Sequence, residues 1–230
     1  MKTIFNKNLL VTFALLIAIT FQVKAQTISY DTTFRPGNYA AKLADFKRNP
    51  ISKKDFVFLG NSITAGGNWS KLLNLPKAQN RGISGDITYG VLERLDEIIA
   101  GKPSKIFILI GINDVSRNIP DSIILGNYKK MISRIKKGSK KTKIYFYTLL
   151  PVNSSFAKFK NHYGKDEHIL WLNSEIKKLA EKKVIIIDLY PVFLDADQHL
   201  RAELTKDGLH LLPAGYQVWV DFLKTGKYLK

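Results

Sequence analysis

Five apolar runs, rich in β-branched and aromatic residues, recur along the chain. They lie at residues 56–59, in a short run ending near residue 80, and at residues 106–110, 144–149 and 184–188. Runs that are apolar at every position are typical of strands buried on both faces of a parallel sheet. Helical patterns separate them, at residues 37–48, 86–99, 123–137, 165–181 and 214–223. This alternation predicts an α/β fold with three α/β/α layers, in which helices cover both faces of a doubly wound, five-stranded parallel sheet.

The first 25 residues have the pattern of a signal peptide and are not expected to be part of the folded domain. Lys2 and Lys7 precede an apolar stretch of 13 residues, at 9–21, and Val23-Lys24-Ala25 then places small residues where a signal peptidase cleaves. A membrane-spanning helix needs about 20 apolar residues. We therefore expect cleavage before Gln26 and export to the periplasm or the medium, with no stable membrane insertion afterwards; the alternative is an uncleaved anchor.

The remaining residues, 26–230, are predicted to form a single domain. About 205 residues are ample for one α/β domain and few for two. Cysteine is absent, so neither a disulfide nor a lipid-modified cysteine can hold an exported form of this chain. Its stability has to come from the core. The sequence does not predict an oligomeric state.

The chain is strongly basic, with a formal net charge of +17. Such a charge suits nucleic acid, an anionic polymer or membrane headgroups. However, more than half of the basic residues outside the signal peptide lie where a predicted helix ends or a predicted strand begins. Cations at helix C-termini complement the helix dipole, which is one interpretation; a basic face for an anionic partner is the other. No nucleic-acid recognition motif is present, so nucleic acid is not expected as a partner.

Four short motifs follow one another in the chain: Gly60-Asn61-Ser62-Ile63-Thr64, Arg81-Gly82-Ile83-Ser84-Gly85-Asp86, Gly111-Ile112-Asn113-Asp114 and Asp207-Gly208-Leu209-His210-Leu211. The first three lie just past strand ends, at the rim of the sheet where ligands of open α/β folds bind. Ser62 there is either a helix N-cap or a nucleophile. Asp207 and His210, three residues apart, are either turn residues or a base held in one tautomer by a carboxylate.

Gly85 and Asn113 add hydrogen-bond donors to this set. A glycine lets a backbone N–H approach a reacting carbonyl without a Cβ in the way, and Asn113 can offer its side-chain amide. With the Ser62 N–H they form three candidate donors for a developing oxyanion. Taken singly, each is also an ordinary turn residue.

Together the four motifs resemble the SGNH (GDSL-type) hydrolases, and the resemblance extends from about residue 56 to residue 216. It implies a flavodoxin-like fold and hydrolysis of carboxylic esters through an acyl-enzyme. By motif, Ser62 corresponds to the nucleophile, Asp207 and His210 to its partners, and Ser62, Gly85 and Asn113 to the oxyanion hole. No metal or cofactor is implied. The chain departs from the family at Asn61, where the Gly-Asp-Ser motif has an acid; we interpret this change as tolerated.

The substrate is less clearly indicated. The polar and aromatic segment 151–164 leaves the same rim, and His162 and Tyr163 within it, with Trp69, are candidate substrate-binding residues. No long apolar lid is evident, which favours a short acyl group. The first motif looks like that of exported Bacteroidetes members that deacetylate glycans, and so favours acetylated carbohydrate. The alternatives are a lysophospholipase or thioesterase, and a non-catalytic glycan-binding protein of the same fold.

Overall fold

The computed structural model describes residues 30–230; the predicted signal peptide lies outside them. Five strands form one sheet, in which every neighbouring pair is parallel and the order is β2-β1-β3-β4-β5. Their bounds are Phe56–Gly60 (β1), Ala78–Gly82 (β2), Lys105–Leu109 (β3), Lys143–Tyr147 (β4) and Val184–Ile187 (β5). All five predicted strands are therefore present, and the predicted α/β fold is confirmed.

The strand order reverses direction between β1 and β3. β1 pairs with β2 on one side and β3 on the other, so Gly60 lies beside Gly82 and Leu109 at the carboxyl ends of three strands. A doubly wound sheet binds ligands just beyond the strand ends at such a reversal. The loops that follow these three strands carry Ser62, Gly85 and Asn113.

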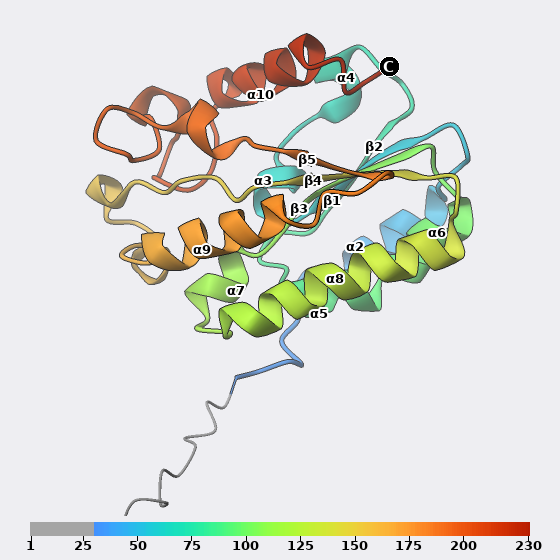
Figure 1. Cartoon of the computed structure of the whole chain (residues 1–230), viewed down its shortest axis with the longest axis horizontal. Coiled ribbons are helices and arrows are strands. Elements are labelled where there is room, and N and C mark those ends of the chain that lie inside the picture. The colour runs from blue at the N-terminus through green and yellow to red at the C-terminus, as the bar shows by residue number, and fades with distance from the viewer. Residues whose placement is uncertain (1–29) are drawn as a thin grey trace, which may run out of the picture. The chain divides into compact units, whose positions relative to one another are not determined.

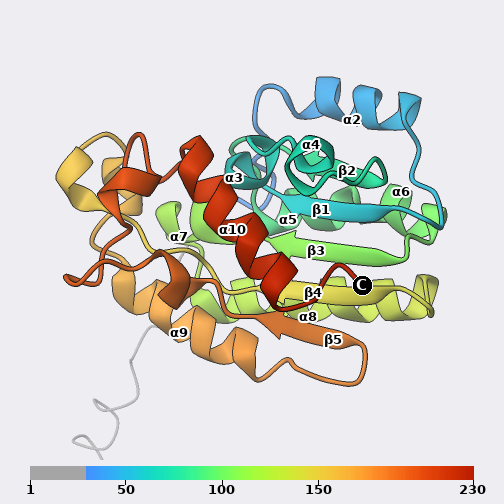
Figure 2. The same ribbon diagram turned by 90° about the horizontal axis from the view of Figure 1, so that it is seen from above.

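Helices cover both faces of this sheet (Figures 1 and 2). α10 and α4 lie on one face, and α5, α8 and α9 lie on the other (Figure 1). The α-helices are Tyr39–Arg48 (α2), Ser62–Ala65 (α3), Trp69–Leu73 (α4), Thr88–Glu93 (α5), Leu95–Gly101 (α6), Ile112–Ser116 (α7), Asp121–Gly138 (α8), Asp166–Lys177 (α9) and Pro213–Thr225 (α10). Short 3₁₀ turns lie at Ser154–Phe156, Lys160–His162, Tyr190–Phe193 and Ala202–Leu204.

An aromatic stack fills the space between the sheet and α10. Phe58 of β1 stacks on Phe107 of β3 at 4.8 Å between ring centroids, and Phe107 stacks on Tyr145 of β4 at 4.6 Å. Trp69 of α4 and Trp219 of α10 complete the stack, and both are 1% exposed. Such large buried rings contribute much of the hydrophobic stabilisation of a core, and they fix the strands whose ends carry the site.

The helix predicted over residues 86–99 is divided in two. α5 ends and α6 begins at Arg94, whose φ and ψ of −94° and 5° leave the helical region. The Arg94 side chain turns inward instead and pairs with Asp86 at 3.0 Å, with both groups buried. Tertiary pairing thus overrides the continuous apolar periodicity that predicted one helix.

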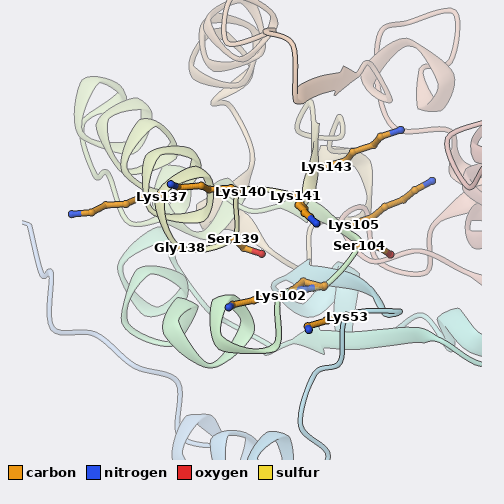
Figure 3. Close-up of a pocket in the computed structure, with 11 residues that line it drawn as sticks. Lys53, Lys102, Ser104, Lys105, Lys137, Gly138, Ser139, Lys140, Lys141 and Lys143 are labelled. Atoms are coloured by element: carbon orange, nitrogen blue, oxygen red, sulfur yellow. The ribbon is translucent and has the colours of Figure 1, made fainter.

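The opposite rim of the sheet is basic. A cavity of about 770 Å³, here called the basal cavity, lies at the starts of β3 and β4. Its lining includes seven lysines: Lys53, Lys102, Lys105, Lys137, Lys140, Lys141 and Lys143 (Figure 3). Within the described range, none of them pairs with an acidic side chain, and Lys105 Nζ donates to the main-chain oxygens of Tyr228 and Lys230. Burial lowers the pKa of Lys105 to about 8, and the charges of Lys143 and Lys77 add to this effect.

Between residues 30 and 230, no helix combines the length and the apolar character needed to cross a membrane.

Candidate active site

Ser62 is the first residue of α3, directly after β1. Asn61 caps this short helix, because its side-chain oxygen accepts a hydrogen bond from the Ile63 N–H at 3.0 Å. The cap is what an aspartate would also provide here, which explains how Asn61 can replace the acid. Asn61 is 1% exposed, and its Nδ2 atom has no partner within the described residues.

His210 and Asp207 reach Ser62 from the turn before α10. The Ser62 hydroxyl lies 2.9 Å from His210 Nε2, and His210 Nδ1 lies 2.9 Å from Asp207 Oδ2. The other carboxylate oxygen accepts the backbone N–H groups of His210 and Leu209. With Nδ1–H donating to the carboxylate, Nε2 is left as the acceptor that faces the Ser62 hydroxyl.

The turn also keeps Asp207 ionised. Burial alone would raise the pKa of this carboxyl group, but the backbone and side-chain hydrogen bonds from His210 outweigh burial and lower the pKa below its ordinary value. A carboxylate that is charged at neutral pH can hold the imidazole in one tautomer and stabilise its protonated form. This arrangement can therefore move a proton from Ser62 to His210.

Three donors border the same cavity as Ser62. Gly85 has φ of +81°, which its turn requires and which a residue with a Cβ adopts rarely. Neither the Ser62 N–H nor the Gly85 N–H donates a hydrogen bond within the described residues. Asn113 Nδ2 donates one proton to the Asp86 carbonyl at 2.9 Å, which leaves its second proton free. The three predicted oxyanion-hole residues thus line one cavity, and each keeps at least one N–H without a partner in the described chain.

Buried polar groups hold these loops in register. Arg94 donates to Asp86, to the Arg81 carbonyl at 2.8 Å and to the Gly60 carbonyl at 3.0 Å, and so it joins the ends of β1 and β2 to the Gly85 loop. Asp114, beside Asn113, accepts from the backbone and hydroxyl of Thr88. Burial raises the pKa of Asp114 to about 7, against the lowering effect of the Thr88 hydrogen bonds.

The segment after β4 folds over the site, as the sequence predicts. Its His162 Nε2 lies 3.1 Å from Asn113 Oδ1, and the Phe159 ring packs edge-on against His210 at 5.0 Å between centroids. Burial, with smaller effects from the charges of His210, Lys165 and Arg117, lowers the pKa of His162 to about 4. His162 is therefore neutral at pH 7 and faces a proposed oxyanion donor.

Two of the three predicted substrate-binding residues lie elsewhere. Trp69 is buried in the aromatic stack, where its Nε1 donates to the Thr64 carbonyl at 2.9 Å. Tyr163 does not line the cavity; its hydroxyl donates to the Asp207 carbonyl at 2.9 Å and braces the His210 turn. The prediction of Trp69 as a substrate contact is wrong, because core packing takes up this side chain; that of Tyr163, whose hydroxyl braces a loop, stays a prediction.

The cavity around Ser62, here called the Ser62 cavity, has a volume of about 1070 Å³. It is lined by Ser62, Gly85, Asn113, His162 and His210. Basic side chains that the sequence did not predict at this site also line it. Those cations are Arg117, Lys158 and Lys160. The sequence instead predicts a basic rim at the strand starts, on the far side of the sheet. The sequence Lys158-Phe159-Lys160, in a loop predicted to lie at this rim, could have indicated a basic side of the site.

The comparisons with known proteins agree with this geometry. The sequence profile of the GDSL-like lipase/acylhydrolase family matches residues 58–218, so the chain belongs to this family of ester hydrolases. An arylesterase from Vibrio mimicus is 29% identical over 74% of this chain and 85% of its own length. An N-acylneuraminate cytidylyltransferase from Streptococcus agalactiae is 26% identical over 74% of this chain. The chain spans about two fifths of that longer relative.

Solved structures show the same fold. A protein from Streptococcus pneumonia, described as a candidate platelet activating factor, is 28% identical and superposes with a TM-score of 0.76 over 95% of this chain and 99% of its own. A GDSL-like lipase from Bacteroides thetaiotaomicron is 25% identical, with a TM-score of 0.69 over 84% of this chain and 98% of its own.

Proposed function

We propose that the protein is an exported serine esterase that removes short acyl groups, acetyl above all, from carbohydrate. The observation that carries the proposal is the continuous hydrogen-bonded series Ser62–His210–Asp207, with 2.9 Å at each step, beside three available donors. A nucleophile, a base, an orienting acid and an oxyanion site are the groups that acyl transfer requires.

In the proposed mechanism, Ser62 Oγ attacks the ester carbonyl carbon while His210 Nε2 takes the hydroxyl proton. The negative charge on the carbonyl oxygen is met by the N–H groups of Ser62 and Gly85 and by Asn113 Nδ2. The bond to the alcohol then breaks, and the alcohol leaves with the proton from His210. Water repeats the sequence on the acyl-enzyme, releases the acid and restores Ser62. No metal or cofactor is part of this proposal.

The cavity lining supports a short acyl group. Apart from Phe159 and Leu209, the side chains around Ser62 are polar, charged or small. A long acyl chain gains its binding energy by packing against large apolar side chains, and among the described lining residues only Phe159 and Leu209 are of this kind. Carbohydrate as the alcohol is supported by the name of the Streptococcus agalactiae relatives, which act on N-acylneuraminate, a sugar.

The first test compares p-nitrophenyl acetate, butyrate and octanoate as substrates of residues 26–230, with acetylated xylan as a polymer. We expect activity to fall from acetate to octanoate, and Ser62→Ala to lower kcat by about 10³-fold or more. Ser133→Ala, on the exposed face of α8, is the matched control and should retain full activity. Activity that rises with chain length would instead support a lysophospholipase or thioesterase.

Absence of turnover on all of these esters would support the glycan-binding alternative. Export is tested separately, by fractionating cells that express the full chain: the proposal expects a product in the periplasm or medium that begins at Gln26. An intact N-terminus held in the membrane would contradict it.

A further inference from the structure

The Ser62 cavity is lined by cations without a compensating acid. Arg117, Lys158 and Lys160 border it, and no aspartate or glutamate of the described chain is among its lining residues. The catalytic carboxylate of Asp207 lies behind His210 and is 3% exposed. A substrate that enters this cavity therefore meets positive charge at its mouth and little negative charge.

Arg117 is arranged to receive a planar anion. It caps the C-terminus of α7, the same short helix that carries Asn113. Its guanidinium carbon, Cζ, lies over the Phe34 ring, 3.2 Å from the centroid, so the cation is supported by an aromatic contact. Among residues 30–230 it has neither an ion-pair partner nor a side-chain hydrogen bond. Asp31, whose pKa its charge helps to lower, is itself bonded by Thr33.

Lys158 and Lys160 lie on either side of Phe159 in the chain, and Phe159 contacts His210. Phe159 packs edge-on against both His210, at 5.0 Å, and His162, at 5.8 Å. This packing places the two neighbouring lysines at the cavity, and both are exposed and without an ion-pair partner in the described chain. Burial and then the charge of His210 lower the pKa of His162, and the charges of Lys165 and Arg117 add to this effect.

We propose that Arg117, Lys158 and Lys160 form a subsite for a carboxylate carried by the alcohol part of the ester, so that the substrate class is an acylated acidic sugar. The Arg117 guanidinium supplies paired N–H donors that match the two oxygens of a carboxylate. The ammonium groups of Lys158 and Lys160 add positive charge without fixing the orientation of the carboxylate. The subsite deepens the proposed function and rests on it, because it concerns the substrate that Ser62 attacks.

The test uses three acetylated sugars that differ in one group: O-acetylated glucuronic acid, its methyl ester, and O-acetylated glucose. Acetate release gives kcat/KM for each, and p-nitrophenyl acetate reports the catalytic residues independently. We expect the acid to exceed its methyl ester by about tenfold, as a charge-assisted hydrogen bond provides. Arg117→Gln and the triple variant Arg117→Gln/Lys158→Gln/Lys160→Gln should reduce this ratio towards one.

The acid-to-ester ratio is measured within each variant, so a general loss of activity or folding cancels. The matched control is Lys102→Gln/Lys140→Gln/Lys141→Gln at the basal cavity, which removes the same charge at the opposite rim (Figure 3). This control should leave the ratio and the activity unchanged. If the acid-to-ester ratio falls equally in the control, the preference comes from the electrostatic field of the whole basic protein, and the subsite is overturned.

Further outcomes separate this inference from the proposed function. Equal rates on the acid, its methyl ester and acetylated glucose overturn the subsite and leave the esterase intact. Hydrolysis of p-nitrophenyl acetate without hydrolysis of O-acetylated glucuronic acid also overturns the subsite and leaves the esterase intact. A preference for acetylated glucose 6-phosphate over the acid overturns the assignment to carboxylate. If no ester is hydrolysed, p-nitrophenyl acetate included, the proposed function itself fails.

Discussion

His162 Nε2 lies 3.1 Å from Oδ1 of Asn113, although the two residues are 49 positions apart in the chain. Since Asn113 Nδ2 donates to the Asp86 carbonyl, its Oδ1 has to be the acceptor, and His162 therefore donates from Nε2. The remaining ring nitrogen, Nδ1, is buried and has no partner among the described residues. The hydrogen bond fixes the Asn113 amide, which the proposed mechanism uses as an oxyanion donor.

The first prediction concerns this hydrogen bond. His162→Leu should lower kcat on p-nitrophenyl acetate by about tenfold with little change in KM, because the oxyanion develops only in the transition state. Asn113→Ala, which removes the donor itself, should cost about 10²–10³-fold. His162→Gln, whose amide can still donate to Oδ1, should retain more activity than His162→Leu. Equal losses in the two His162 variants would contradict an orienting role.

The second prediction is a pH dependence of stability. The pKa of His162 is about 4 in the folded protein, against an ordinary value of 6.5. As the pH falls from 6.5 to 4, the unfolded chain gains a proton here and the folded protein does not, so the folded state loses stability. Asp114 acts in the opposite sense, because its pKa of about 7 lies above its ordinary 3.8 and favours the folded state at low pH.

Comparison with His162→Gln isolates the histidine, since both proteins keep Asp114. The Tm of the variant, relative to that of the wild type, should rise as the pH is lowered from 7 to 4. Thermal unfolding followed by circular dichroism across this range measures the difference. Parallel curves for the two proteins would show that His162 titrates alike in the folded and unfolded states.

The third prediction concerns Gly208, between Asp207 and Leu209. Its φ is +80°, and a Cβ at this position would overlap the Asn153 carbonyl oxygen. Gly208→Ala should therefore destabilise the fold by about 1–3 kcal/mol and lower kcat by displacing His210. Gly126→Ala is the control: Gly126 lies inside α8 with no atom near the new methyl group, and the change should stabilise by about 0.5–1 kcal/mol. Urea denaturation measures both.

The fourth prediction concerns the buried pair of Arg94 and Asp86. Arg94→Met leaves Asp86 as an unpaired buried carboxylate and should cost about 3–5 kcal/mol of unfolding free energy. Lys136→Met, which breaks the exposed pair with Glu181, should cost no more than about 1 kcal/mol. Similar losses in the two variants would mean that the inner pair does not hold the loops together.

Local patterns were enough to predict the strands and the fold, and the resemblance carried by the four motifs supplied the predicted catalytic set. A strand that is buried at every position, such as β1 or β3, is recognisable from its own five residues, and each of the four motifs is contained in a few consecutive positions. The order of strands and motifs then places Ser62, Gly85 and Asn113 at one rim, because the carboxyl ends of parallel strands share an edge. The limits of some elements were misjudged, as where the Arg94–Asp86 pair divides the helix at 86–99.

What the sequence by itself determined is therefore the order of strands and helices, through hydrophobic periodicity, and the candidate chemistry of four short motifs. Only the tertiary structure decided which other side chains reach the Ser62 cavity. It buries Trp69 in the core, turns the Tyr163 hydroxyl onto the Asp207 carbonyl, and brings Arg117 and the two lysines to the cavity. The physical reason is that these positions depend on contacts between segments far apart in the chain, and no local pattern encodes such contacts.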